Sequence, residues 1–275
     1  MTLATLAQVL EPALRDGSAV AGLVCLGWED MRAYAMAAQD CGVPVILQAG
    51  PSCRDHTPLP VLGAMMRSLA ADMDVPVVAH LDHGYEADDC RAAIDAGFTS
   101  VMFDGSALPL AENIARTRAI VEMAHAAGVC CEGEIGFVGY ANGVESRGTD
   151  PAEAARFAAE TGVDAMAISV GNAHLQNAPG AGLDEAKIAA IGSVTTIPLV
   201  IHGGSGVPHD QRARLARETA ICKFNIGTEL RQAFGRSLRD SVARDPDRFD
   251  RVQILRDVED PIRAATIAVL RSLKG

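Results

Sequence analysis

The chain lacks the marks of several protein classes. Its formal net charge is −11, so it has no excess of basic residues for non-specific nucleic-acid binding, and we expect no nucleic-acid partner. No apolar run reaches 18 residues, which predicts no transmembrane helix and no membrane partner. The residues that follow Met1 show neither the basic n-region nor the apolar h-region of a secretory signal, and we expect a cytoplasmic protein.

Cysteine usage excludes two further classes. The seven cysteines are an odd number, most of them lie inside apolar runs, and none forms a Cys-x-x-Cys pair. A disulfide framework and a cysteine zinc cluster are therefore not expected. The cysteines are typical of reduced residues in a buried core.

Short apolar runs alternate with segments of helical periodicity along almost the whole chain. Eight runs read as strands: residues 20–27, 44–50, 76–83, 100–105, 129–136, 165–170, 198–204 and 221–227. Eight strand–helix units in a chain of this length predict an α/β protein with a TIM (β/α)8 barrel, in a single domain that covers residues 1–275. A doubly wound sheet is the rival, but Trp28 follows the first run where that fold usually has a glycine-rich turn. Residues 3–14 predict a helix that closes the barrel floor.

Polar residues stand at the ends of six consecutive candidate strands, and in this fold the chemistry lies at the C-terminal strand ends. His83, His174 and His202 come from three different strands, and three imidazoles with an open position form a catalytic zinc pattern. Asp104 and Glu134 are alternate ligands or acceptors that orient the histidines. His80 shares a strand face with Asp82, and we expect it beside the metal ligands rather than among them.

Two glycine-rich segments follow the last two strands. Their candidate phosphate-binding residues are Gly203, Gly204, Ser205, Asn225, Gly227 and Thr228. Backbone N–H groups in the loops after strands seven and eight form the usual phosphate site of barrel enzymes. A third irregular stretch, residues 137–150, is rich in glycine and follows the fifth strand, which is typical of a mobile lid.

Six motifs occur in a recognisable order. They are His-Leu-Asp-His at 80–83, Asp-Gly-Ser at 104–106, Glu-Gly-Glu-Ile-Gly at 132–136, Gly-Asn-Ala-His at 171–174, His-Gly-Gly-Ser-Gly at 202–206 and Asn-Ile-Gly-Thr-Glu-Leu at 225–230. Together they cover about residues 40 to 235. This set resembles the class II, metal-dependent ketose-bisphosphate aldolases, a family that includes the fructose-bisphosphate and tagatose-bisphosphate aldolases.

The resemblance implies a lyase that reversibly cleaves a phosphorylated ketose, similar to fructose 1,6-bisphosphate, into dihydroxyacetone phosphate and an aldehyde. It implies Zn²⁺ as the cofactor, with room for a second divalent metal or a monovalent cation. The three histidines match the zinc ligands, and Asp104 and Glu134 match positions that hold a second or displaced metal. Asp82 matches the catalytic acid, and Glu145, on the loop after strand five, matches the residue that exchanges the substrate's carbon-bound proton. Relatives imply a homodimer or homotetramer.

The sequence departs from the family pattern in its first strand, its second strand, the loop after Glu145 and one position beside a candidate metal ligand. Leu175 stands where the family usually has glycine, directly after His174. Leucine does not easily take a positive φ, and its side chain adds bulk near the pocket. We therefore expect the dihydroxyacetone phosphate half to be retained, and recognition of the aldehyde half to differ from that of an ordinary fructose-bisphosphate aldolase.

Three alternatives stay open at this point. The chain has only three lysines, and Lys223, two residues before Asn225 on the same strand face, is a candidate for a Schiff-base aldolase. A metal-dependent sugar-phosphate epimerase or isomerase would use the same metal and phosphate sites. A non-catalytic paralogue that serves as a regulatory subunit is the third, although the retention of Asp82 and the three histidines argues against it.

Overall fold

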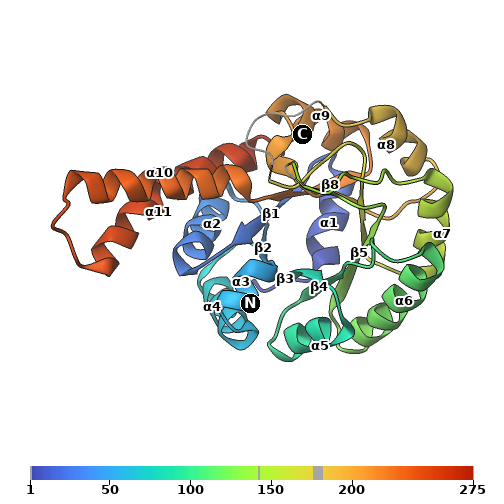
Figure 1. Ribbon diagram of the computed structural model, residues 1–275, viewed down its shortest axis with the longest axis horizontal. Coiled ribbons are helices and arrows are strands. Elements are labelled where there is room, and N and C mark those ends of the chain that lie inside the picture. Colours follow the sequence, from blue (N-terminus) through green and yellow to red (C-terminus); the bar gives the residue numbers. More distant parts are fainter. Residues whose placement is uncertain (1, 142, 176–181, 275) are drawn as a thin grey trace.

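Eight parallel strands close into a barrel in the order β1 to β8, in a computed structural model that describes residues 2–141, 143–175 and 182–274 (Figure 1). The strands are β1 Val20–Cys25, β2 Val45–Ala49, β3 Val77–Gly84, β4 Ser100–Phe103, β5 Cys130–Ile135, β6 Ala165–Ile168, β7 Leu199–Ile201 and β8 Ile221–Ile226. β1 pairs with both β2 and β8, so the sheet has no free edge. The predicted TIM barrel and its eight strands are confirmed.

Helices follow the strands around the outside of the barrel. They are α2 Trp28–Cys41, α3 Pro51–His56, α4 Leu59–Asp72, α5 Ala87–Asp95, α6 Leu110–Ala126, α7 Pro151–Thr161, α8 Glu185–Gly192, α9 His209–Glu218, α10 Thr228–Arg244 and α11 Arg251–Arg271. A short 3-10 turn, Gly204–Gly206, follows β7. Asp150 caps α7 by accepting hydrogen bonds from the backbone N–H groups of Ala152 and Glu153. Such a cap satisfies N–H groups that have no partner inside the helix.

The remaining helix, α1 Leu6–Arg15, precedes β1 and closes the floor of the barrel, as predicted. Leu6, Val9 and Leu10 pack against inward-facing residues at the N-terminal strand ends, among them Val78 and Val200. This end of the barrel is therefore filled with apolar side chains, and the polar residues are left to the other end.

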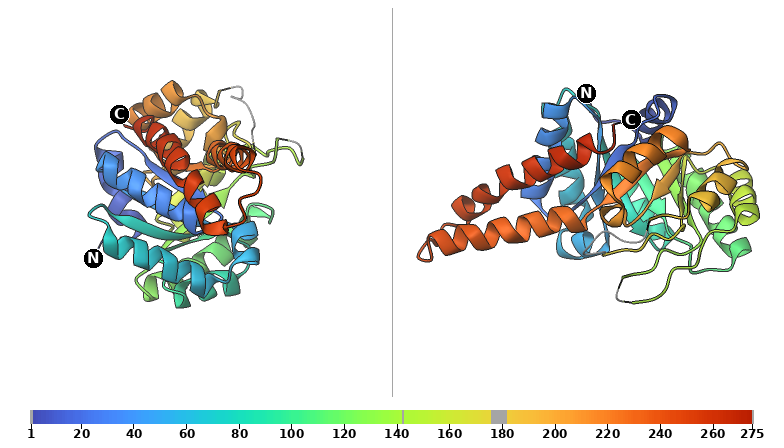
Figure 2. Two further views of the ribbon diagram at one scale, coloured as in Figure 1. Left: turned by 90° about the vertical axis from the view of Figure 1, so that its left-hand side faces the viewer. Right: turned by 90° about the horizontal axis from the view of Figure 1, so that it is seen from above.

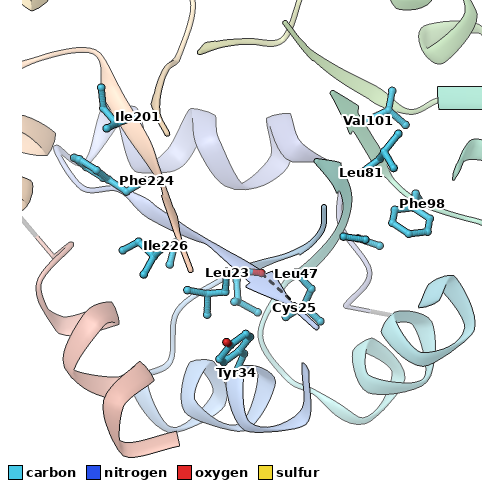
Figure 3. Close-up of a cluster of buried hydrophobic side chains, with 14 of the residues drawn as sticks. Leu23, Cys25, Tyr34, Leu47, Leu81, Phe98, Val101, Ile201, Phe224 and Ile226 are labelled. Atoms are coloured by element: carbon cyan, nitrogen blue, oxygen red, sulfur yellow. Dashed lines mark hydrogen bonds between the residues drawn. The ribbon is translucent and has the colours of Figure 1, made fainter. Parts of the chain in front are cut away.

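A second apolar layer lies between the sheet and the outer helices (Figure 3). Alternate residues of each strand point outward into it, for example Leu81 of β3 and Phe224 of β8. On β3 this alternation leaves His80 and Asp82 facing the barrel interior, since side chains of a strand alternate between its two faces. All seven cysteines are free thiols, and six of them are buried, in agreement with the sequence.

Helices α10 and α11 form an antiparallel arm that projects from one side of the barrel (Figure 2). α11 returns along α10 and packs against α2. At the outer end of the arm, the side chain of Phe249 is 95% exposed. Among the described residues, no helix has the length and apolar character needed to span a bilayer.

Candidate active site

A pocket opens at the C-terminal end of the barrel, where the sequence places the polar residues. Its lining residues come from the C-terminal ends of six strands or the segments that follow them, and from the long loop after β5. They are Val24, Gly50, Pro51, Ser52, Asp82, His83, Tyr85, Tyr140, His174, Leu175, Gly203, Ser205, Asn225, Gly227, Thr228 and Arg231. β4 and β7 end at Phe103 and Ile201, so Asp104 and His202 lie one residue beyond a strand.

The three predicted metal-binding histidines meet in one cluster. Each of His83, His174 and His202 offers a ring nitrogen, and the three nitrogens lie within 4.8 Å of one another. The centroid of the His83 ring is 4.8 Å from that of His202 and 5.2 Å from that of His174. Asp104 and Glu134 form a second group with His83 under the same limit. Five residues from five strand ends therefore form two groups, which share His83, that could hold a metal ion.

His83 is turned into the pocket by an irregular strand end. It follows the inward-facing Asp82, so regular alternation would point it outward; instead the β3–β4 register shifts here, and His83 has a φ of 52°. A positive φ costs a non-glycine residue of the order of 1–3 kcal/mol and is concentrated at functional sites. The Nδ1 atom of His83 lies 2.8 Å from Oδ2 of Asp104, so Nδ1 donates to the carboxylate and Nε2 is left for the cluster.

Carboxylates dominate the electrostatics around His83. Burial acts to lower the pKa of His83, but the carboxylates of Asp82 and Asp104 outweigh it and raise the pKa to about 10. Burial and the nearby His83 and His202 lower the pKa of His174 to about 3. Burial, together with Asp104, raises the pKa of Glu134 to about 7. The raised pKa values of His83 and Glu134 reflect the crowding of carboxylates in this site. A bound cation would offset the negative charge of these carboxylates.

His202 is fully buried between two glutamates of β5. Its Nε2 atom is 3.0 Å from Oε1 of Glu132, and its Nδ1 atom is 3.5 Å from Oε2 of Glu134. Neither Nδ1 of His202 nor Oε2 of Glu134 has a hydrogen-bond partner, although both atoms are buried. Buried polar atoms without a partner are uncommon in native structures, and a missing ion is one explanation for them.

His174 is held by the long loop after β5. Its backbone N–H donates to the carbonyl oxygen of Gly139 at 2.7 Å, and its carbonyl oxygen accepts from the N–H of Ala141 at 3.0 Å. The ring of Tyr140 lies 5.2 Å from the imidazole, measured between centroids. The predicted lid, residues 137–150, is irregular as expected, although Asn142 lies outside the described residues; its mobility stays a prediction.

Beneath the cluster lies a buried polar layer. Nζ of Lys223 is 2.6 Å from Oε2 of Glu132, and both side chains have an exposed fraction of zero. The Nδ1 atom of His80 is hydrogen-bonded to the hydroxyl of Ser100, and its Nε2 atom lies 3.8 Å from Oε2 of Glu132. Burial and the charge of Lys223 lower the pKa of His80 to about 3, so this imidazole is neutral. His80 is thus close to the cluster but outside it, as the sequence predicts.

Asp82 lines the pocket beside the cluster and is 6% exposed. Burial acts to raise the pKa of its carboxyl, but the neighbouring His83, His202 and Lys223 hold it below its usual range. Nδ2 of Asn225 lies 3.4 Å from Oδ1. An ionised carboxylate at this place can accept a proton from a bound hydroxyl group.

The predicted phosphate-binding residues gather beside the cluster, at the ends of β7 and β8. Five of the six line the pocket; the exception, Gly204, lies buried behind it. Gly203 has a φ of 65°, and a Cβ atom at this position would collide with the carbonyl oxygen of Ala173. The hydroxyl of Ser205 accepts from the N–H groups of Gly227 and Glu229 at 3.3 Å each, in the first turn of α10. The wall therefore combines glycine backbone with a helix N-terminus, which suits a phosphate group.

Two residues singled out from the sequence stand apart from this centre. Glu145 is exposed on the long loop and does not line the pocket. Leu175 lies at the pocket rim, is 49% exposed, and takes a φ of 56°. Leucine therefore occupies the left-handed conformation that glycine would take without strain, at a cost of about 1–2 kcal/mol.

Sequence reasoning did not single out Arg231, Tyr85 or Tyr140, which also line the pocket. Arg231 lies in the first turns of α10, and its Nε atom is buried without a hydrogen-bond partner. The only signal for it is its place six residues after Asn225, on the helix that follows the phosphate-binding wall. It adds a cation to the pocket lining near Gly227.

Fold and site together define a barrel enzyme with a cation-binding cluster beside an anion-binding wall. The family model described as fructose-bisphosphate aldolase class-II matches residues 4–274. The chain belongs to this family; it is a lyase, and it cleaves a phosphorylated sugar by an aldol reaction. The family is generally metal-dependent, in keeping with the histidine cluster.

Named relatives agree with the family but differ in substrate. The chain is 37% identical over 278 residues to a fructose-bisphosphate aldolase of Geobacillus stearothermophilus, covering 98% of this chain and 96% of the relative. It is 38% identical over 261 residues to a 6-phospho-5-dehydro-2-deoxy-D-gluconate aldolase of Bacillus subtilis, covering 91% and 88%. Among solved structures, the YdjI aldolase of Escherichia coli K12 superimposes with a TM-score of 0.85 at 28% identity, covering 98% and 97% of the two chains.

Proposed function

We propose that this chain is a zinc-dependent aldolase that cleaves a phosphorylated ketose, similar to fructose 1,6-bisphosphate, into dihydroxyacetone phosphate and an aldehyde. The observation that carries the proposal is the meeting of His83, His174 and His202 next to the glycine-rich wall at Gly203. Three neutral imidazoles with an open position are typical of catalytic zinc.

The residues present fit a divalent cation. Asp104 and Glu132 each take one nitrogen of an imidazole, on His83 and His202 respectively, so the other nitrogen of each ring can bind a metal. Nδ1 of His202 and Oε2 of Glu134 are buried and without partners, as expected for atoms that face an ion. When bound, the cation would act as a Lewis acid that polarises the substrate's ketone and stabilises the negative charge that develops during cleavage.

The position and charge of Asp82 suit the residue that carries the proton during cleavage. Its carboxylate lies at the pocket surface beside the histidine cluster, and neighbouring positive groups favour its ionised form. In the cleavage direction it would take the proton from the substrate hydroxyl whose carbon becomes the aldehyde. In the condensation direction it would return that proton, as microscopic reversibility requires.

The wall between β7 and β8 would bind the phosphate of the dihydroxyacetone half. Ser205, Gly227 and Thr228 present a hydroxyl and the start of α10 to the pocket. Anchoring one end of the substrate holds the bond to be broken between the cluster and Asp82. Glu145 would exchange the carbon-bound proton of this half after the loop closes over the pocket.

Arg231 bears on the choice of substrate. It lines the pocket and has no ion pair among the described residues, in a chain of net charge −11. A guanidinium matches carboxylate and phosphate groups, and the named relatives act on substrates with more than one acidic group or with an acid and a phosphate. We therefore expect the aldehyde half to carry a negative charge.

The Schiff-base alternative loses its support from the geometry. Lys223 is fully buried, is ion-paired with Glu132, and does not line the pocket. A nucleophilic lysine must reach the substrate carbonyl as a free amine. Lys223 instead has the role of a charge partner inside the barrel.

The proposal is tested on protein stripped with a chelator and then titrated with Zn²⁺. Cleavage of fructose 1,6-bisphosphate, tagatose 1,6-bisphosphate and ketose 1-phosphates is followed by the release of dihydroxyacetone phosphate. We expect no activity in the stripped protein, recovery at about one Zn²⁺ per chain, and no inactivation by borohydride in the presence of substrate. Full activity without metal, or covalent trapping by borohydride, would refute the zinc mechanism, and epimerised products without cleavage would favour the isomerase.

We also propose a homo-oligomer, a dimer or a tetramer. The exposed Phe249 lies in the segment that joins α10 to α11, with Val242 and Val252 also exposed nearby in the sequence. Covering such apolar groups is a common reason for association. Light scattering coupled to size exclusion should report a dimer or tetramer, and Phe249→Ser should shift it toward the monomer.

A further inference from the structure

The barrel interior contains an ion pair that does not touch the pocket. Lys223 of β8 and Glu132 of β5 are separated by 2.6 Å, and both have an exposed fraction of zero. Neither lines the pocket. A buried ion pair loses the hydration of two charges, and packed apolar residues in its place are often as stable or more so. Fold stability alone therefore does not account for this pair.

The two oxygens of Glu132 have different partners. Oε2 accepts from Nζ of Lys223, and Oε1 lies 3.0 Å from Nε2 of His202. A lysine ammonium can only donate, and an ionised carboxylate can only accept. Nε2 of His202 must then carry the hydrogen, because it faces an acceptor. The other nitrogen, Nδ1, then keeps its lone pair; this buried atom makes no hydrogen bond, and its near neighbour is Oε2 of Glu134 at 3.5 Å, which is itself a candidate metal ligand.

We propose that Lys223 is a positioning residue for the metal: by binding Oε2 of Glu132 it holds Oε1 against Nε2 of His202, so that the hydrogen stays on Nε2 and Nδ1 is left free to bind a cation. This inference rests on the proposed metal site at the three histidines. Lys223 acts through two hydrogen bonds and contacts neither the metal nor the substrate.

The amide variant Glu132→Gln separates the role of Lys223 from that of a packing residue. In this variant Lys223 still requires an acceptor, so it takes the carbonyl oxygen of the amide. The NH₂ group of the amide then faces Nε2 of His202, which must become an acceptor. The hydrogen moves to Nδ1, where it blocks metal binding. One atom is changed, with almost no change in volume.

In the double variant Lys223→Met/Glu132→Gln the constraint is gone. Methionine has no hydrogen to donate, so the carbonyl oxygen of the amide can turn to Nε2 of His202, which restores the original tautomer. A packing role for Lys223 predicts no such recovery, because each substitution would then add its own loss and the coupling measured by a double-mutant cycle would be close to zero. A role as charge partner alone also predicts recovery, because the double variant removes both charges of the pair. The tautomer of His202 separates that role from the positioning role.

The experiment measures the Zn²⁺ dissociation constant of the metal-free proteins by competition with a chromophoric chelator. We expect Glu132→Gln to bind Zn²⁺ about 10–100-fold more weakly than the wild type, the usual scale for groups that orient a metal ligand. The double variant should bind at least about 5-fold more tightly than Glu132→Gln. Lys223→Met leaves Glu132 buried without its cation, and we expect it to bind Zn²⁺ more weakly than the double variant. If Glu132→Gln does not fold, Lys223→Met replaces it in the comparison with the double variant. Lys274→Met, on the surface, is the matched control and should bind as the wild type does.

A second readout reports the tautomer directly. Imidazole ¹⁵N shifts of the metal-free protein should show hydrogen on Nε2 of His202 in the wild type and the double variant, and on Nδ1 in Glu132→Gln. A double variant that binds Zn²⁺ no better than either single variant, or an unchanged tautomer in Glu132→Gln, would overturn the role of Lys223. If His202→Ala binds Zn²⁺ as the wild type does, the proposed metal site fails instead.

Discussion

The backbone N–H of His174 donates to the carbonyl oxygen of Gly139 at 2.7 Å, which joins a candidate metal ligand to the loop that follows β5. The same loop carries Glu145, and its own ends are joined by reciprocal hydrogen bonds between Phe137 and Arg147. The loop is thus tied to the histidine cluster at one point and leaves Glu145 in solvent at another. Movement of Glu145 toward the pocket is compatible with a fixed His174.

This arrangement predicts ligand-dependent protection of the loop. Arg147 is an exposed tryptic site inside it, whereas Arg244 and Arg248 lie in the projecting arm. Cleavage after Arg147 should slow when Zn²⁺ and dihydroxyacetone phosphate are both present, because closure lowers the population of the open form. Cleavage in the arm should not change and serves as the internal control. Equal rates at Arg147 with and without ligands would remove the lid from the mechanism.

Zinc content should depend on the cluster. His202→Ala removes a fully buried donor, and we expect the Zn²⁺ affinity and the cleavage rate to fall together, by more than the roughly 10–100-fold typical of a supporting group. The control is His125→Ala, since His125 is paired with Asp164 on the outside of the barrel. The readouts are metal content after gel filtration and the steady-state rate. A His202→Ala protein with full zinc and full rate would contradict the assignment.

Asp82 should move protons without retaining metal. Asp82→Asn keeps the size of the side chain and can still contact Asn225, but it cannot accept the hydroxyl proton. We expect unchanged Zn²⁺ content and a fall in kcat of about 10²-fold or more. Parallel loss of metal in this variant would make Asp82 a ligand.

Glu145 should act on the donor half alone. Glu145→Gln is expected to slow the exchange of the carbon-bound proton of dihydroxyacetone phosphate with deuterated solvent, with little change in Zn²⁺ content. The matched control is Glu153→Gln, an exposed position at the start of α7. Exchange is read by proton NMR. If it proceeds at the wild-type rate in Glu145→Gln, another group carries this proton.

Leu175 gives a prediction that combines stability with selectivity. At a φ of 56°, leucine costs about 1–2 kcal/mol, whereas glycine costs about 0.5–1 kcal/mol of chain entropy. Leu175→Gly should therefore unfold at the same temperature as the wild type or up to about 4 °C higher. Because Leu175 lines the pocket rim, the ratio of kcat/KM among the bisphosphates and ketose 1-phosphates should also change.

The control is Val194→Gly, an exposed position after α8 that lies outside the pocket. It should lower the unfolding temperature and leave the kcat/KM ratios unchanged. A lower unfolding temperature for Leu175→Gly would contradict the backbone strain at Leu175, and unchanged kcat/KM ratios would contradict its role in selectivity.

The barrel was predictable because each strand is a short apolar run, and the strand ends were predictable because polar residues interrupt those runs at one end only. His83 shows where this reasoning stops: its neighbour Asp82 already faces inward, and only the irregular strand end turns both toward the pocket. No periodicity reports such a change in backbone. The family's usual glycine raised the question of a positive φ at Leu175, but only the structure shows that leucine adopts this conformation.

Contacts across the barrel were harder to predict than positions along it. Lys223 and Glu132 are 91 residues apart, and their pairing depends on the tilt and stagger of the strands. Without that geometry Lys223 remained a candidate nucleophile. Arg231 was missed because a sequence does not show that a long side chain in the first turns of α10 reaches the pocket. Its buried Nε atom became visible only in three dimensions.

The pairing of β1 with β8 joins residues 20–23 to residues 223–226. On the ribosome, the strand that closes the barrel is therefore made after all three histidines, and Asn225, Gly227 and Thr228 emerge with it. A nascent chain that stops short of β8 can contain every candidate metal ligand and still lack one side of the phosphate-binding wall. Substrate can then stabilise only chains that have completed the ring, so ligand binding selects finished molecules over partly folded ones.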